Sequence, residues 1–88
     1  MEVLYSPKFV RQYKKLPREI QELAAKREDI FRVNPFDSRL KTHKLTGRLK
    51  EFSAFWIDYH IRIMFDFAED SKGKYARFYQ IGPHDIYD

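Results

Sequence analysis

The sequence has no cysteine, only three glycines and four prolines, and no long hydrophobic run. Without cysteine the chain can form neither a disulfide nor a thiolate metal site, which is compatible with a cytoplasmic location. No apolar stretch approaches the roughly 20 residues that a helix needs to cross a bilayer. The segment 1–5 is too short and too acidic for a signal peptide. We therefore expect a cytoplasmic protein with no membrane partner.

Acidic residues are missing from one segment of the chain. Residues 39–50 contain five Lys and Arg, one His and no Asp or Glu. A cationic stretch without compensating acids favours a polyanion or an acidic protein partner, although a solvated surface is the alternative. The segment belongs to a basic connector, residues 36–50, that has no helical or strand periodicity. The candidate phosphate-binding residues within it are Lys41, Lys44, Arg48 and Lys50.

The remaining composition is that of one small domain, residues 1–88, with a high aromatic share of 17%. Residues 3–5 predict a short strand. Ser6-Pro7 predicts a helix start, because Ser caps helices and Pro is tolerated in the first turn. Pro17 predicts the start of a second helix, which ends at Asn34-Pro35.

The second half of the chain is typical of strands, which we place at residues 52–58, 60–67 and 75–81, with a loop at residues 69–74. The order of elements is therefore β-α-α-β-β-β. We predict an α+β fold in which the N-terminal strand and a two-helix hairpin pack on one face of a small antiparallel β-sheet. The other face of the sheet is left open for a ligand.

Arg62 is the first candidate for chemistry. Odd-numbered positions in the strand 60–67 are all apolar and are expected to face the helices, so the even-numbered positions face the other way. A rigid strand on the open face can present the Arg62 guanidinium to a phosphate. An ion pair with Asp58 or Asp66 is the structural alternative. His60 shares the open face and is expected to be structural.

His84 and His43 are the second group of candidates, because histidine titrates near neutral pH and suits general acid or base catalysis. His84 follows Gly82-Pro83, with Asp85 beside it as a group that could orient the ring. Tyr87 could stack on a base or donate a hydrogen bond. His43 lies in the basic connector. An ordinary surface position is the alternative for each histidine.

These groups suit cleavage of RNA without a metal ion. A base removes the 2′-hydroxyl proton, the oxygen attacks the adjacent phosphate, cations stabilise the added charge, and an acid protonates the leaving 5′-oxygen. No cluster of Asp and Glu has metal-binding spacing, and three scattered histidines do not form a zinc motif. A glycine-rich phosphate loop and a nucleophile elbow are also absent. We expect no metal and no cofactor.

Three segments resemble the RelE/ParE superfamily of type II toxins. Residues 43–50, HKLTGRLK, are similar to its basic segment before the sheet, and residues 59–65, YHIRIMF, to its central strand. Residues 81–87, IGPHDIY, are similar to its C-terminal ending. The last two segments are fairly specific when they occur together, and the resemblance extends over nearly the whole chain.

The resemblance implies an mRNA interferase, an endoribonuclease that cuts mRNA on the ribosome and is inhibited by a cognate antitoxin. It implies that Arg62 contacts the scissile phosphate and that His84 transfers a proton, as in YoeB- and YafQ-type toxins. His43 matches a loop histidine of YafQ-like members, and Tyr87 an aromatic position. We expect an acidic antitoxin segment to cover residues 39–50. The main alternative is a ParE-like inhibitor of DNA gyrase, a binding protein that has no need of the two histidines. A third interpretation is a non-toxic relic or a general RNA-binding module.

Overall fold

The structure is a computed structural model that describes residues 1–83. Its elements are β1 (Glu2–Tyr5), α1 (Pro7–Lys14), α2 (Arg18–Val33), β2 (His43–Lys44), β3 (Ser53–Trp56), β4 (Ile61–Asp70) and β5 (Gly73–Pro83), with short 3-10 helices at Ser38–Leu40 and Gly47–Leu49. The predictions for His84, Asp85 and Tyr87 lie outside the described residues. Within the described part of the chain, neither helix is long and apolar enough to span a membrane.

Helix α1 begins where the sequence predicts, whereas α2 begins one residue later than predicted, at Arg18, with Pro17 as its N-cap. The Ser6 side chain accepts a hydrogen bond from the Phe9 backbone N–H at 3.0 Å, and Pro7 occupies the first helical position. Pro17 caps α2, because its fixed φ suits a helix start and it has no N–H to leave unpaired. The helix ends at Val33, with Asn34 as its C-cap directly before Pro35. Pattern and capping therefore agree over the whole helical hairpin.

The sheet has five strands in the order β1-β5-β4-β3-β2. The N-terminal strand, which the sequence predicts to pack with the helices on one face of an antiparallel sheet, is instead an edge strand of that sheet, and β1 pairs with β5 in parallel. The chain leaves β1 through both helices and returns much later, so the two strands are not joined by a hairpin and can run in the same direction. The strand β2 was not predicted, since a pair of residues shows no periodicity.

The predicted loop at residues 69–74 is also wrong, because it is a tight hairpin. The strands continue to Asp70 and resume at Gly73, and the Asp70 carboxylate accepts a hydrogen bond from the Lys72 backbone N–H at 2.9 Å. Gly73 has a φ of 119°, a backbone conformation that residues other than glycine rarely adopt. Turn chemistry therefore shortens the connection and lengthens both strands.

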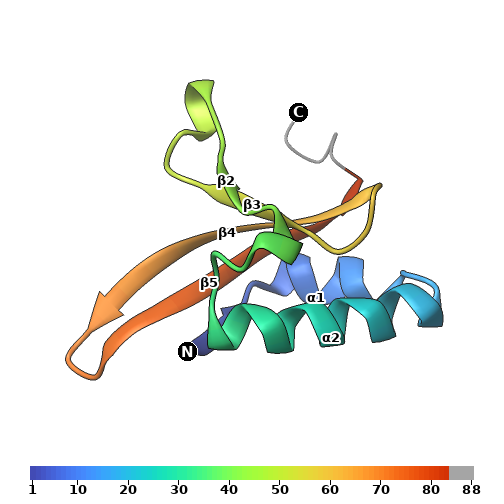
Figure 1. The fold of residues 1–88 in the computed structure, drawn as a ribbon, viewed down its shortest axis with the longest axis horizontal. Helices are drawn as coiled ribbons and strands as arrows, with labels where there is room; N and C mark the ends of the chain where they lie inside the picture. The colour runs from blue at the N-terminus through green and yellow to red at the C-terminus, as the bar shows by residue number, and fades with distance from the viewer. Residues whose placement is uncertain (84–88) are drawn as a thin grey trace.

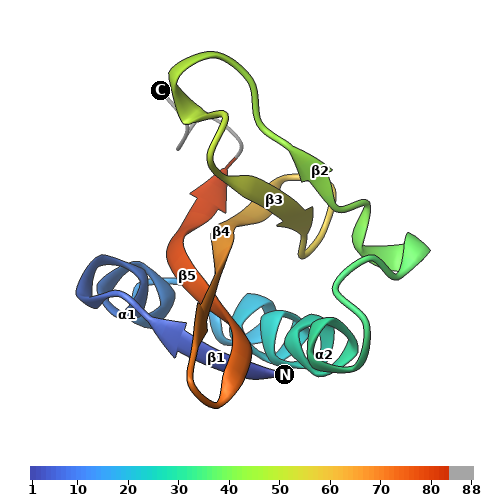
Figure 2. The same cartoon turned by 90° about the vertical axis from the view of Figure 1, so that its left-hand side faces the viewer.

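The helices cover one face of the sheet, and the core lies between the two layers (Figures 1 and 2). Phe31 of α2 is fully buried and packs against aromatic rings from three strands. Its ring centre lies 4.8 Å from that of Phe55, 4.9 Å from that of Phe65 and 5.2 Å from that of Phe78. The predicted α+β fold, with both helices on one face, is confirmed. We call the opposite side of the sheet the helix-free face.

A β-bulge in β5 changes which side chains of that strand face the core. Met64 pairs with Gln80 and Phe65 with Phe78, so Tyr79 is an extra residue on β5. Phe78 and Ile81 are three positions apart and would lie on opposite faces of a regular strand, yet both are buried. The bulge therefore turns both toward the helices.

Phe31→Ala should lower the free energy of unfolding by about 3–5 kcal/mol, because it removes the ring shared by three strands and leaves a cavity. Urea denaturation followed by circular dichroism measures the change. Phe36→Ala is the matched control, since Phe36 is 66% exposed and its truncation should cost far less. Equal denaturation midpoints for the two variants would contradict the proposed centre of the core.

Candidate functional site

Arg62 lies on the helix-free face, in the middle of the sheet. It pairs with Trp56 of β3 on one side and with Gly82 of β5 on the other. Residues that are directly opposite across a ladder share a face, so Trp56 stands beside Arg62 while Gly82 adds no side chain there. The carbon of the guanidinium lies 4.1 Å from the centre of the Trp56 ring. Its Nη1 donates to the Asp58 carbonyl oxygen at 2.8 Å. Arg62 is therefore anchored on two sides.

No carboxylate within residues 1–83 forms an ion pair with Arg62. The Asp58 carboxylate instead accepts hydrogen bonds from the backbone N–H groups of His60 at 2.8 Å and Ile61 at 2.7 Å, and so fixes the turn between β3 and β4. The alternative of an ion pair between Arg62 and Asp58 is therefore wrong. Arg62 contacts the neutral backbone carbonyl group of Asp58, and this contact does not cancel its positive charge.

Asp66, the other candidate partner, is held by Arg77 of β5. Both carboxylate oxygens of Asp66 accept from Arg77, at 2.8 Å and 2.7 Å, in a bidentate ion pair. The Tyr79 hydroxyl in the bulge donates to the same carboxylate at 3.2 Å. Hydrogen bonding to Asp66 raises the pKa of Arg77, and burial together with the Asp66 charge raises the pKa of Tyr79. Asp66 is thus neutralised by Arg77, four residues along β4 from Arg62.

Lys41 and His43 reach the same face from the connector. The Lys41 ammonium lies 5.9 Å from the centre of the Trp56 ring. His43 pairs with Ala54, so it shares the face of Trp56 and Arg62. Its Nδ1 lies 3.0 Å from the Lys41 carbonyl oxygen, and the side chain is exposed. The result is a cluster of Arg62 and Lys41 at one tryptophan, with the His43 side chain on the same face of the sheet.

The other cations of the connector do not join this cluster. Lys44 pairs with Ser53 and therefore faces the other side of the sheet. Arg48 and Lys50 are exposed in the loop between β2 and β3. Arg39 forms an ion pair with Asp37 at 2.9 Å, and this contact lowers the pKa of Asp37 to about 2. The candidate phosphate-binding set is thus divided in space, and Lys41 is the one of its four members that lies at the Trp56 ring with Arg62.

Trp56 is the member of the cluster that the sequence analysis missed. Alternation could have found it, because Phe55 and Ile57 are buried on the helix side and Trp56 between them must face outward. His60, by contrast, precedes β4 and lies exposed in the turn, with its ring 5.0 Å from that of Tyr59. Within residues 1–83 no group of three or more His, Asp and Glu side chains is placed to hold a metal ion.

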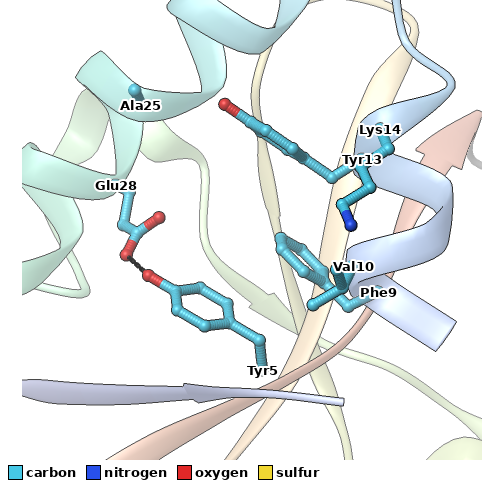
Figure 3. Close-up of a pocket in the computed structure, with 7 residues that line it drawn as sticks. All are labelled: Tyr5, Phe9, Val10, Tyr13, Lys14, Ala25 and Glu28. Atoms are coloured by element: carbon cyan, nitrogen blue, oxygen red, sulfur yellow. Dashed lines mark hydrogen bonds between the residues drawn. The ribbon is translucent and has the colours of Figure 1, made fainter. Parts of the chain in front are cut away.

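A concavity lies on the helix side of the molecule, between β1, α1 and α2 (Figure 3). It has a volume of about 360 Å³ and is lined mainly by Tyr5, Phe9, Val10 and Tyr13. The Tyr5 hydroxyl donates to Glu28, which also pairs with Arg32 at 3.0 Å. Burial raises the pKa of Tyr5. This mostly apolar pocket suits the binding of an apolar group and contains neither Arg62 nor a histidine.

Neither a scan against models of protein families nor a search of curated proteins finds a match to this sequence. Solved structures do match its fold. The YoeB/ParE toxin from Agrobacterium tumefaciens superposes with a TM-score of 0.79 at 14% identity, covering 96% of this chain and 99% of that chain. YafQ from E. coli strain BL21(DE3) gives 0.73 at 16% identity, covering 98% and 96%.

A chain of the archaeal RelE–RelB complex from Pyrococcus horikoshii OT3 gives a TM-score of 0.70 at 16% identity, covering 93% of this chain and 92% of that chain. These matches extend over almost the whole length of this chain and of each matched chain, and include the helices and the sheet. The described chain therefore has the fold of the RelE, YoeB and YafQ toxins.

Proposed function

We propose that this protein is the toxin of a type II toxin–antitoxin system and acts as a metal-independent endoribonuclease on mRNA at the ribosome. The observation that carries the proposal is the cluster of Arg62 and Lys41, with His43 on the same helix-free face, where no described carboxylate neutralises Arg62. Solved relatives of this fold include toxins in complex with antitoxins, such as RelE–RelB and DinJ–YafQ. Such a site attracts a polyanion.

Arg62 is the group that binds the scissile phosphate in this proposal. Its Nη1 is engaged by the Asp58 carbonyl oxygen, whereas Nε and Nη2 have no partner within residues 1–83. The Nε–H and Nη2–H bonds point in the same direction, which suits two parallel hydrogen bonds to phosphate oxygens. As the 2′-oxygen attacks, charge builds on those oxygens, and a preorganised guanidinium stabilises the transition state more than the ground state.

His84 is proposed to move the proton at the reacting centre, with His43 as the second acid–base group and Tyr87 as a contact to a base. Strand β5 supports the first assignment, because it brings Gly82 opposite Arg62 and Pro83 opposite Ile61 immediately before position 84. His43 is exposed on the same face as Arg62 and can exchange protons with solvent. Lys41 would add positive charge beside the phosphate, and Lys44, Arg48 and Lys50 would contact RNA farther away.

Arg62→Ala and His84→Ala should each abolish growth arrest on induced expression. We expect a fall in mRNA cleavage of about 100-fold or more, the usual effect of removing a preorganised charge or a general acid or base. Mapping of mRNA 5′ ends measures cleavage, and a gyrase supercoiling assay runs in parallel. Arg11→Ala and His60→Ala are the matched controls, since both residues are exposed and outside the cluster.

The two measurements separate the possible results. New 5′ ends with normal supercoiling support the nuclease. Intact transcripts with inhibited gyrase would support the ParE-like alternative. Full toxicity of both Arg62→Ala and His84→Ala would place the active site elsewhere on the molecule.

The antitoxin is proposed to bring an acidic segment to residues 39–50. Lys44→Glu and Arg48→Glu should each weaken the complex with the co-expressed antitoxin by about two- to tenfold, because each replaces an attractive surface charge by a repulsive one. Titration calorimetry at low and high salt measures the change, which should shrink as salt screens the charges. Lys8→Glu in α1 is the matched control, and an equal loss for all three variants would contradict a specific role for the connector.

A further inference from the structure

We propose that Trp56 is a positioning residue that holds Arg62 and Lys41 together as a binding site for one phosphodiester group. The inference rests on the proposed function, because it assigns a substrate contact to the same face. Trp56 is added to the proposed site as an aromatic support for the two cations, and its fluorescence reports directly on the site. Trp56 is the only tryptophan in the chain.

Two cations approach Trp56 from the segments on either side of β3. Arg62 stands on β4, directly opposite Trp56, with its guanidinium carbon 4.1 Å from the ring centre. Lys41 comes from the side of β2, with its ammonium 5.9 Å from the same ring centre. Like charges in one place repel each other, and the negative faces of an indole ring offset part of that repulsion. The ring thereby keeps both charges on the helix-free face.

The contact with Trp56 also restrains Arg62. A guanidinium on a long side chain has several rotamers, and each hydrogen bond it makes must overcome their entropy. Here the guanidinium carbon lies over the Trp56 ring, 4.1 Å from its centre, and Nη1 donates to the Asp58 carbonyl oxygen at 2.8 Å. The turn itself is fixed by the Asp58 carboxylate. The two contacts direct the Nε and Nη2 edge away from the turn, in the orientation that a phosphate can accept.

The backbone at Lys41 supports the same conclusion. Lys41 is the one residue other than glycine with a positive φ within residues 1–83, and its φ of 52° lies in the left-handed region. Residues with a Cβ rarely adopt that conformation, and it persists where the surrounding structure enforces it. At this position it follows the 3-10 helix at Ser38–Leu40 and accompanies a side chain that reaches Trp56. The connector therefore bends at Lys41, the residue whose ammonium group lies near the Trp56 ring.

The first experiment compares Trp56→Phe with Trp56→Leu in mRNA cleavage on translating ribosomes. Leu fills part of the space but has no π-face, so kcat/KM should fall about tenfold, which corresponds to about 1.4 kcal/mol. The loss should lie mainly in kcat, because Arg62 acts on the transition state. Phe should retain activity to within about threefold, since it keeps an aromatic face. Phe36→Leu, an exposed aromatic elsewhere, is the matched control.

The folding of each variant is checked by circular dichroism and thermal unfolding. Should Trp56→Leu fail to fold, Arg62→Lys carries the test, because Lys keeps the charge but loses the planar guanidinium that lies over Trp56 and its fork of N–H donors. Arg62→Lys should then show the tenfold fall in kcat/KM that is otherwise expected of Trp56→Leu. Activity of Trp56→Leu or Arg62→Lys equal to that of the parent protein would overturn the inference.

The second experiment uses the fluorescence of Trp56 and requires no cleavage. A short single-stranded oligodeoxynucleotide lacks the 2′-hydroxyl nucleophile and is bound without being cut. Its binding, followed independently by anisotropy of a labelled strand, should change Trp56 emission with the same midpoint. Arg62→Ala and Lys41→Ala should each shift that midpoint about tenfold to weaker binding, while Arg11→Ala leaves it unchanged. Binding without a change in emission, or no binding at all, would overturn the inference.

The two experiments keep the inference and the proposed function apart. If the parent protein cuts no RNA but the oligonucleotide shifts Trp56 emission through Arg62 and Lys41, the nuclease proposal fails and the phosphodiester site stands. If RNA is cut equally well by the parent protein and by Trp56→Leu, the nuclease proposal stands and the positioning role fails.

Discussion

The packing of Phe31 against the sheet is the interaction on which the rest of the structure depends. Its ring contacts residues from β3, β4 and β5, so one side chain of α2 decides which face of the sheet the helices cover. Because side chains alternate along a strand, each residue that joins this core sends its neighbours to the other face. Arg62 lies between Ile61 and Ile63 for that reason. The composition of the helix-free face is thus a geometric consequence of the core.

The bulge at Tyr79 is a second constraint with an effect on both faces. It buries Phe78 and Ile81 together, and it also shifts the register so that Gly82 comes opposite Arg62. Without the extra residue, the pairing beyond Gln80 would move by one position and a different side chain would stand beside Arg62. Tyr79 itself bonds Asp66 from the helix-free side. One irregular residue therefore links the packing of the core to the surroundings of the site.

Much of the fold could be predicted from local chemistry. Ser6-Pro7 and Pro17 mark helix starts by fixed backbone preferences, and the apolar odd positions of 60–67 place Arg62 on the open face without knowledge of its neighbours. Features that depend on pairing between distant segments could not be predicted from local chemistry. The parallel pairing of β1 with β5, the short strand β2 and the bulge are all set by register across the sheet. A single strand's sequence carries little information about its partner.

The same division applies to the site. Residue types suggested Arg62, His43 and the lysines, because charge and titration are properties of single side chains. Composition could not separate Lys41 from Lys44, which differ only in the face that the β2–β3 pairing gives them. The role of Trp56 depends on a neighbour six positions along the chain, reached through a hairpin. Alternation gives its face, but the contact with the guanidinium follows only from the ladder.

The distribution of carboxylates decides what the helix-free face can bind. A protein with an arginine in mid-sheet usually compensates its charge with a nearby acid, and Asp58 and Asp66 are both close enough in sequence to do so. Asp66 is instead bound at both oxygens by Arg77, and the Asp58 carboxylate is used to form a turn. Each acid thus stabilises structure beside Arg62 without cancelling its charge. Stability and anion binding therefore do not compete for the same group, and the charge of Arg62, which pairs with no carboxylate of residues 1–83, can be directed at a ligand.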